Sequence, residues 1–238
     1  MKAHVYGKPR IIGPEFADYF APDRTAVISI DMHRSHLDPS GECPSPAPRA
    51  LEIIEPIDRF HSDARALNIP VIHVRTTLRK NGIDDVNGIS AAWRRTWPFY
   101  AGVTERSIDH AVEGSEWVEF VTSVDPSDLV VSTKKRLSIF YPTDLDFLLR
   151  NLRREIVVLN GGFTDCCVLN AAFDASNHNY RVLVLNDLVR GTNDELENAA
   201  LAIISLNLGL VVDSADLLEK WRDDKIDTRR DTLGGEHA

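Results

Sequence analysis

Short runs of β-branched and aliphatic residues recur along the chain with little polar alternation inside them. Runs of this kind are typical of strands that are buried on both faces of a sheet. The runs cover residues 26–30, 71–74, 129–131, 156–159, 182–185 and 210–212. We therefore expect six buried strands.

Between these runs lie segments whose apolar residues are spaced three or four positions apart, which is the helical period. These segments are Leu51-Ile54-Ile57-Phe60, Leu145-Leu148-Leu152, Val168-Ala172-Ala175 and Ala199-Ile203-Leu206. Alternation of strand and helix predicts right-handed crossovers and a parallel sheet with helices on both faces. The pattern predicts an α/β fold, a Rossmann-like three-layer αβα sandwich with a mainly parallel six-stranded sheet.

One stretch, residues 79–125, does not follow this alternation and is rich in aromatic residues, Trp93 and Trp97 among them. Such an insertion can line a pocket or pack at a subunit contact, and the sequence leaves both possibilities open. We expect one domain over residues 1–238, with residues 1–23 as an N-terminal extension and the charged residues 223–238 as a flexible tail.

The composition of the chain disfavours several classes of binding partner. A net charge of -9 and a pI near 5.4 disfavour binding to nucleic acid or to anionic membranes. No apolar stretch approaches the ~20 residues that span a bilayer, and the polar start lacks a signal-peptide core, so we expect a cytoplasmic protein. Three cysteines, two of them adjacent, do not make a disulfide framework, so their role is in chemistry or packing.

Three polar residues follow apolar strand runs: Asp31, Lys134 and Cys167. Substrates of parallel sheets bind beyond the carboxyl ends of the strands, so these side chains should face one rim. Taken singly, an Asp in this place is usually a helix cap, a Lys a solvated charge and a Cys a core residue. Their coincidence at three strand ends favours a functional site.

Cys167 follows a Gly-Gly turn and opens an apolar helix, with Thr164 and Asp165 as candidate caps. A thiol with a pKa of about 8.5 needs roughly 2.7 kcal/mol to become mostly thiolate at pH 7. A helix dipole supplies only about 0.3 to 1 kcal/mol. A Lys134 ammonium at about 4 Å would supply roughly 4 kcal/mol at an effective dielectric of 20. Asp31 would raise the thiol pKa, so its useful role is that of a base.

Three motifs resemble those of the isochorismatase-like cysteine hydrolase superfamily. The strand that ends in Asp31-Met32 is similar to the family's Asp-Met-Gln strand, with His33 in place of the glutamine. Residues 134–145 match a Lys-x-Arg-x-x-x-Phe-x-x-Thr-x-Leu block, and residues 162–168 match Gly-x-Thr-Asp-x-Cys-Val. The resemblance covers residues 24–218.

The resemblance implies an amidohydrolase in which Asp31 is the base, Lys134 holds charge and Cys167 is the nucleophile of a thioester mechanism. It also implies a cis peptide between Gly162 and Phe163, and an oxyanion hole made by the backbone N–H groups of Phe163 and Cys167. The expected substrate is a small linear amide, carbamoyl or ureido compound that the sequence does not name, and family members form homodimers or homotetramers.

The remaining expectations concern the pocket and cofactors. We expect His33, Trp93, Trp97 and Phe140 to line the substrate pocket. We expect no metal or other cofactor, because the strand at residues 71–76 lacks the Asp-x-His element that the family's nicotinamidases use. Two alternatives remain: an isochorismatase proper, which cleaves a vinyl ether and lacks the nucleophilic cysteine in the family pattern, and a catalytically idle binding protein on the same fold.

Overall fold

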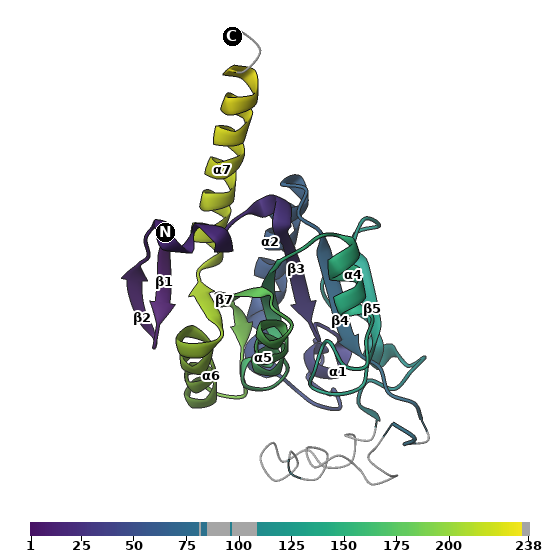
Figure 1. Ribbon diagram of the computed structural model, residues 1–238. Coiled ribbons are helices and arrows are strands. Elements are labelled where there is room, and N and C mark those ends of the chain that lie inside the picture. Colours follow the sequence, from purple (N-terminus) through teal and green to yellow (C-terminus); the bar gives the residue numbers. More distant parts are fainter. Residues whose placement is uncertain (81, 85–95, 97–108, 235–238) are drawn as a thin grey trace.

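The computed structural model describes residues 1–80, 82–84, 96 and 109–234. Within this part of the chain one sheet has eight strands in the order β2-β1-β8-β7-β6-β3-β4-β5 (Figure 1). The strands are β1 (Lys2–Val5), β2 (Lys8–Ile11), β3 (Thr25–Ile30), β4 (Val71–Thr76), β5 (Leu129–Lys134), β6 (Ile156–Gly162), β7 (Arg181–Arg190) and β8 (Gly209–Val212). The six predicted strands are β3 to β8, and they run parallel.

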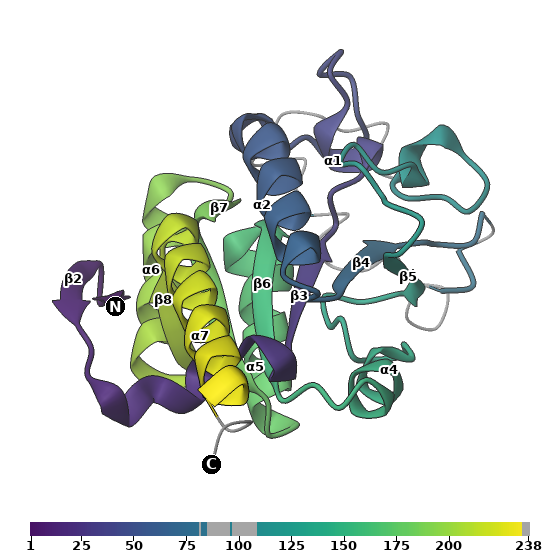
Figure 2. The same ribbon diagram turned by 90° about the horizontal axis from the view of Figure 1, so that it is seen from above.

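Helices cover both faces of the sheet (Figures 1 and 2). The α-helices are α1 (Arg34–Leu37), α2 (Ile54–Ala66), α4 (Leu145–Asn151), α5 (Leu169–Asn177), α6 (Asp194–Asn207) and α7 (Ser214–Gly234). Shorter helical turns are η1 (Pro14–Tyr19), η2 (Pro22–Arg24), η3 (Pro48–Ile53), η5 (Glu116–Val118) and the π-helical η6 (Thr164–Val168). In the described part of the chain, no helix combines the length and the apolar character needed to cross a membrane.

Two hydrophobic clusters fill the spaces between the layers. Helices α2 and α7 pack on one face of the sheet, where Phe60 and Trp221 are buried with Val27 of β3. Helices α4, α5 and α6 pack on the other face, where Ile28 of β3 is buried. Successive residues of β3 thus enter opposite layers, as the period of a strand requires. The predicted three-layer architecture is confirmed.

The predicted count of six strands is wrong, because residues 1–23 contribute two further strands to the sheet. Strands β1 and β2 form a hairpin, and β1 pairs antiparallel with β8 through His4 and Val211. The side chain of Ala3 is fully buried. These two strands carry polar residues, so they lack the apolar run by which the other strands were recognised.

The buried face of α6 also differs from the expectation. The spacing of Ala199, Ile203 and Leu206 predicted the buried face of α6, yet Ile203 is 38% and Leu206 57% exposed. The buried face uses Ala200, Leu201 and Ile204 instead. Apolar residues lie on more than one side of α6, so spacing alone could not choose the side. The segment that begins at residue 223 is helical as far as Gly234, and its expected flexibility stays a prediction.

Candidate active site

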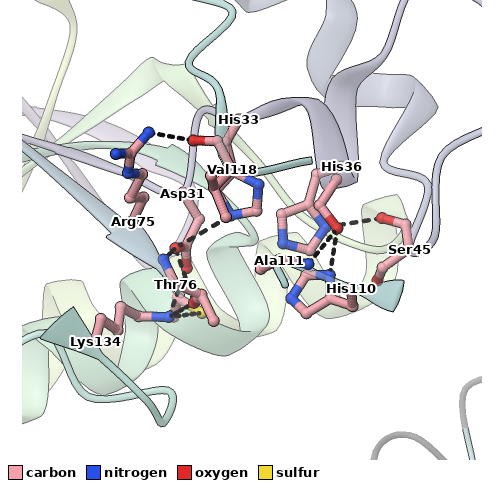
Figure 3. A network of polar contacts seen from close by, with 12 residues as sticks. Asp31, His33, His36, Ser45, Arg75, Thr76, His110, Ala111, Val118 and Lys134 are labelled. Carbon is pink, nitrogen blue, oxygen red and sulfur yellow. Dashed lines mark hydrogen bonds and ion pairs between the residues drawn. The ribbon is translucent and has the colours of Figure 1, made fainter. Parts of the chain in front are cut away.

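Four neighbouring strands each bring one side chain to the same edge of the sheet. In the order β6-β3-β4-β5, Cys167 lies in η6 just after β6, Asp31 directly follows β3, Thr76 ends β4 and Lys134 ends β5. The carboxyl ends of parallel strands meet at one rim, which brings residues far apart in the chain together. Figure 3 shows Asp31, Thr76 and Lys134 converging there.

Asp31 is held from several directions. Its backbone has a φ of 52°, which turns the chain out of β3, and its N–H donates to the Val74 carbonyl at 2.8 Å. Carboxylate Oδ1 accepts from the Thr76 N–H at 2.8 Å and from the Thr76 hydroxyl at 3.1 Å. Oδ2 accepts from Lys134 Nζ at 2.7 Å. The side chain is 1% exposed, so these partners replace its water.

Lys134 connects the carboxylate to the thiol. Its Nζ donates to Asp31 Oδ2 and to Thr76 Oγ1, each at 2.7 Å, and to Cys167 Sγ at 3.4 Å. An ammonium has three hydrogens, and these contacts account for all of them. Thr76 and Lys134 face each other in the register of β4 and β5, so the sheet itself places the lysine beside its hydroxyl partner.

The turn that carries Cys167 begins where β6 approaches β3 very closely. Gly161 has a φ of 107°, and a Cβ there would lie 2.3 Å from the Ile30 carbonyl oxygen, so only glycine fits. The next peptide bond, Gly162–Phe163, is cis, and this is the bond for which the resemblance implied that form. The backbone N–H groups of Cys166 and Val168 both donate to the Phe163 carbonyl oxygen at 3.1 Å. These two hydrogen bonds close the turn that carries Cys167.

The two candidate helix caps do not act as caps. No side chain caps η6, whose N-cap residue is Phe163. Asp165 instead accepts hydrogen bonds from the N–H and the hydroxyl of Thr192, both at 2.7 Å, and thereby ties the turn to the loop before α6. Thr164 is fully buried, and its hydroxyl has no hydrogen-bond partner in the described part of the chain.

The charges of the three central groups are strongly coupled. Burial alone would raise the pKa of Asp31, but Lys134 and His33 outweigh it and hold that pKa well below its usual value. Burial opposes the charge of Lys134, yet Asp31 and Cys167 raise its pKa. Burial raises the pKa of Cys167, Lys134 lowers it and Asp31 raises it again, which leaves it well above its ordinary value.

These pKa directions favour a resting site in which an ionised Asp31 and a charged Lys134 lie beside a protonated Cys167 thiol. These directions do not by themselves favour a thiolate, so the expectation that Lys134 supplies the energy to form one stays a prediction. The Lys134 ammonium is 2.7 Å from the Asp31 carboxylate and 3.4 Å from the Cys167 sulfur. It therefore stabilises negative charge on Asp31 more than negative charge on the sulfur. Forming the thiolate requires that a base take the proton.

Three histidines lie next to this group (Figure 3). The His33 and His36 ring centroids are 4.9 Å apart, and His110 lies 4.8 Å from His36 and 5.8 Å from His33. His33 is fully buried, with Nε2 at 3.6 Å from Asp31 Oδ1. The Nδ1 atom of His110 is 2.7 Å from the Ser35 hydroxyl oxygen. Burial sets the pKa of His110 well below its ordinary value.

The other predicted site residues have different outcomes. Phe140 stacks on His178 at a centroid distance of 4.9 Å and belongs to the same hydrophobic cluster as Cys167, so its place in the pocket stays a prediction. Trp93 and Trp97 lie outside the described residues. Among the residues that are described, no group of three or more His, Cys, Asp or Glu side chains has the arrangement to hold a metal ion.

Two residues of the site were missed by sequence reasoning. Thr76 lies at the carboxyl end of a strand, as Lys134 does, so a search of strand ends for polar residues could have found it. It was missed because only charged residues and a cysteine were considered at these positions. His110 lies in the stretch without periodicity, where no sequence signal placed it near the sheet.

Comparison with known proteins places the chain in a family. Residues 25–216 match the isochorismatase domain, so the protein belongs to the isochorismatase family and the predicted relationship is confirmed. Maleamate amidohydrolase of Pseudomonas putida is 27% identical over 200 residues, which cover 84% of this chain and 87% of that protein. N-carbamoylsarcosine amidase of Arthrobacter sp. is 24% identical over 168 residues, 70% of this chain and 60% of that protein.

Solved structures agree in fold. A cysteine hydrolase from Pseudomonas syringae pv. phaseolicola superposes with a TM-score of 0.73 at 23% identity, covering 91% of this chain and 98% of that one. N-carbamoylsarcosine amidase from Thermoplasma acidophilum has a TM-score of 0.62 at 23% identity and covers 80% of this chain and 96% of that one. At these identities the likeness shows the fold alone.

Proposed function

We propose that the protein is a cysteine-dependent amidohydrolase that cleaves a C–N bond of a small linear amide, carbamoyl or ureido compound. The observation that carries this proposal is the position of the Lys134 ammonium, 2.7 Å from the Asp31 carboxylate and 3.4 Å from the Cys167 sulfur. All three side chains are buried. A thiol beside a carboxylate and an ammonium is a suitable set of groups for nucleophilic acyl transfer. The family relatives named for maleamate and N-carbamoylsarcosine support the same class of reaction.

In the proposed acylation, Asp31 takes the proton of the Cys167 thiol as the sulfur attacks the substrate carbonyl carbon. The N–H groups of Phe163 and Cys167 donate to the oxygen on which negative charge develops. The C–N bond then breaks, and the proton held by Asp31 passes to the leaving nitrogen. Ammonia departs, and the acyl group remains on Cys167 as a thioester.

In the proposed deacylation, Asp31 takes a proton from a water molecule that attacks the thioester carbon. The C–S bond breaks, the acid leaves, and the proton returns to the sulfur. Lys134 remains charged throughout and stabilises whichever of its two neighbours is negative. Thr76 fixes Asp31 Oδ1 by two hydrogen bonds, which positions the base for both steps.

The test measures ammonia release from maleamate, N-carbamoylsarcosine, nicotinamide, biuret, guanylurea and ureidoacrylate. Wild type is compared with Cys167→Ala and with Cys166→Ala, a matched control because Cys166 is a thiol of the same turn. We expect turnover of at least one compound, its loss by a factor of about 1,000 or more in Cys167→Ala, and little change in Cys166→Ala. Mass spectrometry of the quenched reaction should find the acyl group on Cys167.

Turnover that survives in Cys167→Ala would exclude the assigned nucleophile. Cleavage of isochorismate without ammonia release from any amide would favour the vinyl ether reaction. No activity on any of these compounds would favour a binding protein on the same fold.

A further inference from the structure

The ring of His36 is fixed in one tautomer. Its Nδ1 lies 2.7 Å from the backbone carbonyl oxygen of Ser45, and a carbonyl only accepts, so Nδ1 carries the hydrogen. Burial, and next the neighbouring His33, lower the pKa of His36 to about 3, so the ring is neutral near pH 7. The other nitrogen, Nε2, therefore presents a lone pair.

This lone pair is available close to the proposed reacting groups. Nε2 of His36 has no hydrogen-bond partner among the residues that the structure describes. The His36 ring meets the Phe163 ring edge-on at a centroid distance of 5.1 Å, and it lies 4.9 Å from the His33 ring, which borders Asp31. In Figure 3 the ring lies between Ser45 on one side and the Asp31–Lys134 pair on the other.

A second observation indicates that a polar ligand enters this region. His33 is fully buried; its Nδ1 has no hydrogen-bond partner in the described part of the chain, and its Nε2 has only Asp31 Oδ1, at a long distance of 3.6 Å. A buried polar group without a partner costs about 1 to 3 kcal/mol. A ligand that brings hydrogen-bonding groups between His33 and His36 would remove this cost.

We propose that His36 is a specificity-determining residue whose Nε2 accepts a hydrogen bond from a second N–H group of the substrate. This inference rests on the proposed function and names the substrate class: ureido compounds and diamides, rather than amides that carry a carboxylate. A carboxylate has no hydrogen to donate to Nε2. It would also lie near the Asp31 carboxylate, while the hydrogens of Lys134 are already bonded to Asp31, Thr76 and Cys167.

The test compares maleamide with maleamate, two compounds of the same skeleton in which an amide NH2 replaces a carboxylate oxygen. We expect wild type to hydrolyse maleamide with a kcat/KM about tenfold or more above that for maleamate. His36→Phe keeps an aromatic ring without the acceptor and should lose about tenfold on maleamide but less than about threefold on maleamate. His36→Gln, which can still offer an acceptor oxygen, should retain most of the preference.

His178→Phe is the matched control, because His178 is exposed at 43% of its side chain and stacks on Phe140, away from His33 and His36 in the described contacts. A wild-type preference for maleamate, an equal loss on both compounds in His36→Phe, or no effect of that substitution would each overturn the proposal. So would wild-type ammonia release from nicotinamide with none from maleamide, biuret or guanylurea. If biuret or guanylurea is turned over and maleamide is not, the tenfold loss in His36→Phe is measured on that compound, and an unchanged kcat/KM would overturn the proposal. These outcomes are separate from a failure of the proposed function, which is absence of Cys167-dependent ammonia release from every compound.

Discussion

Replacing Lys134 by methionine leaves a buried carboxylate without its counter-charge. Lys134 is 1% exposed and its ammonium lies 2.7 Å from Asp31, whose side chain is also 1% exposed. Removing one partner of a buried ion pair costs about 3 to 5 kcal/mol. For a chain of 238 residues this corresponds to a fall in Tm of roughly 6 to 20 °C. Urea and thermal unfolding followed by circular dichroism at pH 7 measure both quantities.

The double variant Asp31→Asn/Lys134→Met separates the ion pair from side-chain packing. With both charges gone, the Thr76 N–H can still donate to the asparagine oxygen, so this variant should be more stable than Lys134→Met alone. Its loss should be at least about 2 kcal/mol smaller than the sum of the two single losses. Lys220→Met, which removes a partly exposed ion pair within α7, is the control and should cost about 1 kcal/mol or less.

The pH dependence gives a further check of the same reasoning. In wild type the pKa of Asp31 lies below its unfolded value, so its stabilising contribution is present above about pH 4 and is lost as the pH falls through the folded pKa. Without Lys134, the effect of burial raises the pKa of Asp31. The deficit of Lys134→Met should then shrink between pH 7 and pH 5. Additive single losses, or a deficit that does not change with pH, would refute the argument.

Two predictions concern stability elsewhere. Gly161→Ala should lower the free energy of unfolding by about 2 to 4 kcal/mol, because its Cβ would lie 2.3 Å from the Ile30 carbonyl oxygen. The control Gly162→Ala, whose Cβ would have its nearest contact at 3.6 Å, should lower it by less than about 1 kcal/mol. Urea unfolding measures both values, and equal losses would contradict this prediction. Burial lowers the pKa of His61 to about 3, so the unfolded state takes up protons first and stability falls as the pH drops below 6.5. Between pH 6 and pH 4, the free energy of unfolding of His61→Gln should fall by about 1.4 kcal/mol less per pH unit than that of wild type. An unchanged slope would show that His61 is not the group responsible.

The parts of the fold that sequence could predict are those whose local pattern and tertiary role agree. Strands β3 to β8 are buried on both faces, so their apolar runs marked them, and the rule about carboxyl ends then brought Asp31, Lys134 and Cys167 to one rim. The pocket role of Phe140 stays a prediction, because an aromatic side chain fits a core and a pocket equally well. The hairpin of β1 and β2 was missed because strands at a sheet edge need few apolar residues.

That hairpin also determines how the sheet ends. Without it, β8 would be an outer strand with an apolar Leu-Val-Val sequence and unpaired backbone groups, which is a template for adding a strand from another chain. The outer strand at this edge is β2, whose Lys8, Pro9 and Arg10 are exposed. Proline offers no N–H for pairing and the two cations repel a second copy of the same edge. The polar hairpin thus makes this edge of the sheet a poor template for edge-to-edge aggregation.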